Sequence, residues 1–84
     1  MAVATAAAGT YRHSRLGHAV ISREGRRLVY TAGAVKADLI PTGGDAFLLF
    51  DRAALDTTPL KFNIGESGSY DGFVLDDDRF DRIR

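Results

Sequence analysis

The chain contains no cysteine, so a disulfide scaffold and a thiolate metal site are both excluded. This absence does not identify the cellular compartment, because many periplasmic proteins also lack cysteine. No run of apolar residues approaches the roughly 20 residues that a membrane-spanning helix needs. The sequence therefore predicts no membrane span and leaves the localisation undetermined.

Net charge is also lacking, since 11 basic residues balance 11 acidic residues. A nucleic-acid-binding domain needs a basic surface to neutralise phosphates, so nucleic acid is not an expected partner. Arg23, Arg26 and Arg27 form a local basic cluster. They straddle a predicted hairpin turn, where charged side chains are normally solvated.

The length of 84 residues allows one domain with one modest core. A chain of this size buries only about 60–65% of the surface that it exposes when unfolded, so a deep cleft between two lobes is excluded. Residues 1–8 are rich in alanine and lack the basic region and long apolar run of a signal peptide. We expect a flexible or helical lead-in over 1–8 and a single small β-domain over 9–84.

Short β-like runs separated by turn residues make up that domain. Turn signals at 24–26, 42–45 and 65–69 each contain glycine, which accepts the positive φ of a tight turn. The predicted strands cover residues 9–13, 16–23, 27–32, 36–40, 46–50, 60–64, 70–75 and 80–83. About eight short strands without long helices predict an all-β fold, an antiparallel meander that forms a lipocalin-like barrel or half-barrel.

Some of these segments carry more detailed expectations. Residues 46–50 (AFLLF) are apolar on both faces, which predicts a fully buried strand. Residues 60–64 (LKFNI) alternate between apolar and polar, which predicts a half-buried strand. Pro41 has no amide donor and is expected to end its strand. Residues 51–58 are expected to be irregular, with one helical turn over 52–55.

The nearest approach to a nucleophile motif is Gly65-Glu66-Ser67-Gly68. A nucleophile elbow needs the pattern G-x-S-x-G between a strand and a helix, because the strained turn lifts the serine hydroxyl above the sheet. Here the second glycine comes one residue early, and a predicted strand follows. A hairpin turn therefore explains Ser67 better than catalysis does.

His13 and His18 lie on neighbouring predicted strands, where a hairpin would bring them together. With an Asp they would suit zinc or nickel. Known zinc sites use three or four protein ligands, and nothing in the sequence fixes the third. Solvated or cross-strand polar histidines are therefore the favoured interpretation, and no metal site is predicted.

An acidic run, residues 76–78 (DDD) with Asp81 nearby, lacks the glycine and the spacing of a calcium loop. We expect a turn between the last two strands with its charges facing water. The basic residues expected to balance these acids as weak exposed pairs are Arg79, Arg82 and Arg84.

Aromatic residues comprise three tyrosines and five phenylalanines. They would either line a lipocalin-like ligand cavity or simply fill a small barrel, and the second arrangement is the more common one. The sequence leaves both open.

The order of short motifs along the chain points to a family. The segments are AGTY at 8–11, LGHAVISREGRRL at 16–28, ADLIP at 37–41, DAF at 45–47, LKF at 60–62, GFVL at 72–75 and FDRI at 80–83. This order resembles the lipocalin-like C-terminal accessory domain, of unknown function, that follows serine β-lactamase-like (penicillin-binding-protein-like) hydrolase domains. The likeness covers nearly the whole chain after residue 8.

That resemblance implies an antiparallel barrel or half-barrel without catalytic residues, because in this family the hydrolase domain holds the nucleophilic serine and its lysine. We therefore expect a non-catalytic accessory domain, with no enzyme activity, cofactor or metal, that acts in substrate access or assembly. The expected partners are a serine hydrolase domain or a second copy paired through edge strands. The alternative is a stand-alone lipocalin-like module that binds a small apolar ligand.

Overall fold

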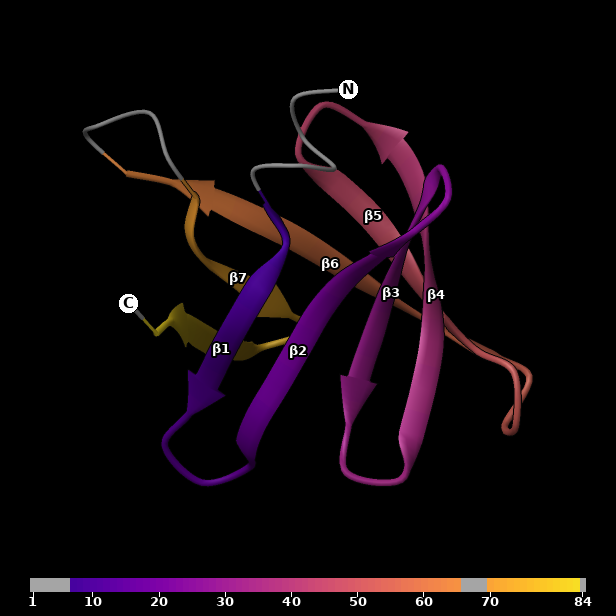
Figure 1. Ribbon diagram of the computed structural model, residues 1–84, viewed down its shortest axis with the longest axis horizontal. Coiled ribbons are helices and arrows are strands. Elements are labelled where there is room, and N and C mark those ends of the chain that lie inside the picture. Colours follow the sequence, from indigo (N-terminus) through magenta and orange to yellow (C-terminus); the bar gives the residue numbers. More distant parts are fainter. Residues whose placement is uncertain (1–6, 66–69, 84) are drawn as a thin grey trace.

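The computed structural model describes residues 7–65 and 70–83, and in them the chain forms an all-β meander (Figure 1). The strands are β1 (Gly9–His13), β2 (Gly17–Glu24), β3 (Arg27–Ala32), β4 (Val35–Gly43), β5 (Ala46–Asp51), β6 (Asp56–Ile64), β7 (Tyr70–Leu75) and β8 (Asp78–Arg82). Each strand pairs antiparallel with the next. The predicted fold class, an antiparallel meander of about eight short strands, is confirmed.

The sheet closes on itself, because β1 also pairs antiparallel with β8. The closing register places Tyr11 opposite Arg82 and Arg12 opposite Asp81, and the Ile83 amide donates to the Thr10 carbonyl at 2.9 Å. Of the two predicted alternatives, the structure is therefore the barrel. Since every strand in this order has two neighbours, the edge strands that self-association was expected to use are paired within the chain.

Aromatic rings pack along the interior of the barrel. Tyr11, Phe62 and Phe73 are almost completely buried. The Tyr11 ring lies 4.9 Å from the Phe73 ring and 6.2 Å from the Phe62 ring, and Phe73 stacks on Phe80 at 4.7 Å between centroids. Tilted and offset pairs at these separations are favourable beyond the area that they bury. In the described part of the chain these rings act as core rather than as the lining of a ligand cavity.

The sequence prediction was wrong about the end of β4 and about the face of Ile64 in β6. Pro41 does not end β4, which continues to Gly43 with a register shift between those two residues. An irregular pairing accommodates a residue that cannot donate an amide hydrogen. A second shift, between Asn63 and Ile64, interrupts the alternation of β6 and leaves Ile64 53% exposed.

Strand β5 is not fully buried, contrary to the prediction for AFLLF. Phe47 and Leu49 face the core, whereas Leu48 and Phe50 lie partly exposed on the outer face. A barrel is a single sheet, so one face of every strand meets solvent unless another layer covers it. The outward-facing side chains of β5, Leu48 and Phe50, are therefore on the surface of the molecule.

The connection between β5 and β6 is shorter than predicted. Residues 52–55 form a turn, and β6 begins at Asp56 rather than after residue 58. The Asp51 carboxylate accepts the amides of Ala53 at 2.9 Å and Ala54 at 3.3 Å, which fixes the first half of the turn. Leu55 closes it with φ at 52°.

Gly72 in β7 gives a direct test of barrel packing. A Cβ at Gly72 would collide with the Phe80 carbonyl oxygen of β8, so Gly72→Ala must push the two strands apart. We expect a loss of about 2–3 kcal/mol in the free energy of unfolding, as for other overpacked sites. Gly33→Ala is the matched control, since its φ of 58° is strained but its Cβ meets open space. The control should lose only about 1 kcal/mol in denaturant unfolding; equal losses would contradict the packing described.

Candidate functional site

The two histidines do not form a pair. In the β1–β2 register His13 lies opposite Gly17 and His18 lies opposite Arg12, so the two side chains leave opposite faces of the sheet. His13 is buried at 7% exposure, and His18 is exposed. The hypothesis that the hairpin brings them together is therefore wrong. The described residues also contain no cluster of three or more His, Asp or Glu side chains that could hold a metal.

His13 instead holds two turns together. Its Nδ1 accepts the amides of Arg15 and Leu16, each at 3.0 Å, and its Nε2 lies 3.2 Å from Asp78 Oδ1. Because Nδ1 accepts two hydrogen bonds, the neutral ring carries its proton on Nε2 and donates it to Asp78. The β1–β2 turn is thus tied to the start of β8. The sequence signal for this role is a histidine at a strand end, directly before a turn.

The acidic run between β7 and β8 only partly follows the expectation. Asp81 pairs with Arg79 at 3.1 Å on the surface, as predicted. Asp78, however, turns toward His13 rather than toward water alone. Arg82 bonds backbone carbonyls, and Arg84 lies outside the described residues. Arg82 donates to the Ala8 carbonyl at 2.8 Å and the Tyr70 carbonyl at 3.1 Å, which joins the lead-in to β7.

Two other sequence candidates can be placed only in part. Ser67 lies outside the described residues, so neither catalysis by Ser67 nor the turn predicted there is tested. Arg23, Arg26 and Arg27 lie exposed around the β2–β3 turn, where Arg23 Nε donates to the Gly25 carbonyl at 2.9 Å. Their exposure agrees with solvated turn charges.

Among the described residues, Tyr70 is the side chain whose pKa is raised the most. Its ring is buried and stacks on Phe62 at 5.3 Å, and its hydroxyl donates to Asp45 Oδ1 at 2.7 Å. Burial, followed by the hydrogen bond and the negative charge of Asp45, raises the pKa of Tyr70 to about 12. The phenol therefore stays protonated at neutral pH and ties β7 to the β4–β5 turn.

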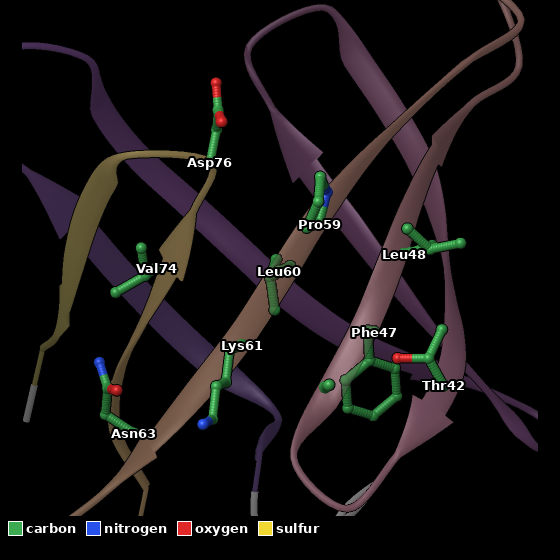
Figure 2. A pocket seen from close by; sticks show the side chains of 10 residues that line it. Thr42, Phe47, Leu48, Pro59, Leu60, Lys61, Asn63, Val74 and Asp76 are labelled. Atoms are coloured by element: carbon green, nitrogen blue, oxygen red, sulfur yellow. The ribbon is translucent and has the colours of Figure 1, made fainter.

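An open groove of about 520 Å³ crosses the outer face of the barrel (Figure 2). Its lining residues are Thr42, Ala46, Phe47, Leu48, Pro59, Leu60, Lys61, Asn63, Val74 and Asp76. Leu48 lies opposite Pro59 in the register, and Lys61 lies opposite Val74. Figure 2 shows Asp76 at one end and Lys61 with Asn63 at the other. The groove is thus an apolar surface with a carboxylate and an ammonium at its two ends.

Polar groups in this groove have few partners of their own. Lys61 forms no ion pair with any residue that the structure describes. The Asn63 Nδ2 is buried and, among the same residues, lacks a hydrogen-bond partner. Sequence reasoning missed this groove because it assigned both faces of AFLLF to the core.

No protein-family model, curated protein or solved structure matches this chain. Among the described residues, no helix has the length and hydropathy that crossing a membrane requires.

His13 can be tested with two substitutions that separate its bonds. His13→Asn keeps an acceptor near the Nδ1 position, whereas His13→Leu keeps the bulk against Phe80 and leaves the Arg15 and Leu16 amides without an acceptor. We expect His13→Leu to lower the free energy of unfolding by about 1–3 kcal/mol more than His13→Asn does. Denaturant unfolding measures both variants. If His13→Leu were as stable as wild type, the role of His13 in the turn would be refuted.

The raised pKa of Tyr70 predicts a loss of folding stability at high pH. Its pKa is about 12 in the folded chain and about 10 when unfolded, so between these values the unfolded state releases a proton that the native state keeps. Stability is therefore full below pH 10 and should fall by about 2 kcal/mol as the pH rises to 12.

The Tyr70→Phe variant isolates this effect from the other tyrosines, including Tyr30, whose pKa is also raised by burial. At neutral pH the variant should lose about 1 kcal/mol for the missing bond to Asp45. It should then lose less between pH 10 and 12 than the wild type does. Parallel stability curves for the two proteins would show that Tyr70 is not the responsible group.

Proposed function

We propose that this chain is a non-catalytic accessory domain that packs beside a hydrolase domain of the serine β-lactamase-like class and acts in substrate access or assembly. The motif order from residue 8 to residue 83 supports the relationship. A closed antiparallel barrel is also one of the two architectures, barrel or half-barrel, that the resemblance implies. The proposal concerns the chain as a packing module rather than as a chemical one.

The use of the buried polar groups supports a role without chemistry. His13 caps a turn, Tyr70 bonds Asp45, and Arg82 bonds backbone carbonyls. A general acid or base needs a partner geometry open to substrate. Each of these side chains forms hydrogen bonds with other parts of the barrel, which is typical of residues with a structural role.

The observation that carries the proposal is apolar exposure where the chain enters the barrel. Ile64 at the end of β6 is 53% exposed, and Ile83 after β8 is 45% exposed. Ile83 lies beside the start of β1, through its bond to Thr10, and Figure 1 shows this end near the first strand. A domain that precedes β1 would attach at this end, and it would cover side chains that the barrel alone leaves in water.

The aromatic packing inside the barrel bears on the alternative function, the binding of a small apolar ligand. A lipocalin-like carrier needs interior space, whereas the rings of Tyr11, Phe62 and Phe73 contact one another along the described core. This packing favours the accessory domain over an internal site for an apolar ligand.

Calorimetric titration tests the proposal, with this chain and a separately expressed serine β-lactamase-like hydrolase domain from the same organism. We expect binding, and we expect the pair Ile64→Ser and Ile83→Ser to weaken it at least about ten-fold. Val20→Ser is the matched control, because Val20 is 41% exposed but lies on the outer face of β2.

The chain alone should not hydrolyse ester or β-lactam substrates. Hydrolysis by the pure chain that Ser67→Ala abolishes would refute a non-catalytic role.

A further inference from the structure

The tip of the β5–β6 hairpin presents an apolar side chain in an unusual way. Figure 1 shows this hairpin extending beyond the rest of the barrel. Leu55 at its tip is 79% exposed, the highest value among the large hydrophobic side chains that the structure describes. Its φ of 52° lies in the left-handed region that glycine or asparagine normally occupies. Because the side chain is exposed, its own packing does not account for a leucine in this conformation.

The turn that carries Leu55 is held in one shape. Asp51 accepts the amides of Ala53 and Ala54, and Arg52 forms an ion pair with Asp38 of β4 at 2.8 Å. The next residue, Asp56, is exposed and accepts the Thr57 amide at 2.9 Å. The tip is therefore a convex apolar projection with a carboxylate directly beside Leu55.

The outer groove of β4–β7 has the complementary properties. Its floor is apolar, with Leu48, Pro59 and Val74, and the ammonium of Lys61 stands at one end without an ion pair among the described residues. A leucine with an aspartate next to it matches an apolar floor with a lysine next to it. Both halves of this match are surfaces of the same chain.

We propose that the Leu55 tip of one copy inserts into the outer groove of a second copy. Leu55 packs on Leu48 and Pro59, and the Asp56 carboxylate faces Lys61. This assembly surface is separate from the end of the barrel at the start of β1, where Ile64 and Ile83 are exposed.

Shape limits how two copies can meet at this contact. Two concave grooves cannot fill each other, so a symmetric groove-to-groove dimer would leave the apolar floors of both grooves exposed to water. Strand addition is also excluded, because the closed barrel pairs its strands internally. The contact joins a tip to a groove, so it forms either a two-fold dimer in which each copy inserts its tip into the other, or a head-to-tail chain. A contact made by one turn is smaller than the roughly 800 Å² per partner of a standard interface, so association should be weak and concentration-dependent.

Sedimentation velocity on the full chain, from about 10 μM to 1 mM, tests this association over the range expected for small interfaces. The wild-type average mass should rise with concentration. Leu55→Gly removes the tip and Leu48→Glu blocks the groove, and each variant alone should stay monomeric. Leu55→Gly relieves the strained φ, so its unfolding midpoint should not fall and loss of folding cannot explain its behaviour.

Mixing the two variants is the decisive step. Leu55→Gly retains a groove and Leu48→Glu retains a tip, so an equimolar mixture should form a 1:1 dimer and nothing larger. In the same way, Asp56→Lys and Lys61→Glu should each weaken wild-type association several-fold, and the double variant should recover it. Leu16→Gly and Ile40→Glu are the matched controls, since both side chains are exposed but lie outside the groove.

Three results would overturn the proposal. They are a wild-type chain that remains monomeric to about 1 mM, a mixture of the two variants that stays monomeric, and association that Leu55→Gly leaves unchanged. Binding to the hydrolase domain through Ile64 and Ile83 is measured separately, in the calorimetric titration. Failure of the assembly surface therefore leaves the proposed accessory function standing, and the reverse also holds.

Discussion

Closure of β1 against β8 is the constraint on which the rest of this structure depends. The seam has a short register, with Tyr11 opposite Arg82 and Arg12 opposite Asp81. Arg82 reinforces it by donating from β8 to the Ala8 carbonyl at 2.8 Å, and the Tyr11 hydroxyl holds the preceding residues by donating to the Ala7 carbonyl at 2.7 Å. Tyr11 also places its ring against Phe73, so the same residue joins the seam to the core. Without this seam the sheet would have two edges, and its aromatic core would face water on one side.

A closed single sheet also determines where function can reside. The inward face of the described barrel is filled by aromatic rings and by polar side chains, such as His13 and Tyr70, that bond to turns. This leaves the outer face and the two ends of the barrel for recognition. Apolar side chains on the outer face, such as Leu48, gain nothing from the core of their own chain. Their presence beside Lys61 is the reason to regard the outer groove as a contact surface. Ile64 and Ile83 at the chain-entry end form a second surface of this kind.

The sequence predicted the type and order of the strands because that information is local. Alternation in β2 and glycine at the β2–β3 turn appear directly in neighbouring residues. Bulges were missed, since the shift at Asn63–Ile64 depends on pairing with β7 rather than on the residues of β6 alone. The AFLLF run was misassigned for a related reason. An apolar residue reads the same in a sequence whether it faces a core or a groove on the surface.

Candidate site residues were harder to predict because their roles depend on distant partners. His13 lies 65 residues from Asp78 in sequence, and Tyr70 lies 25 residues from Asp45. The most direct test of the central claim is amide hydrogen exchange across the seam. If the barrel is closed, the Ile83 amide, which donates to the Thr10 carbonyl, should exchange as slowly as the amides that pair β2 with β3. Fast exchange of Ile83 and of the β8 amides, with β2 to β5 still protected, would show an open half-barrel and contradict the account.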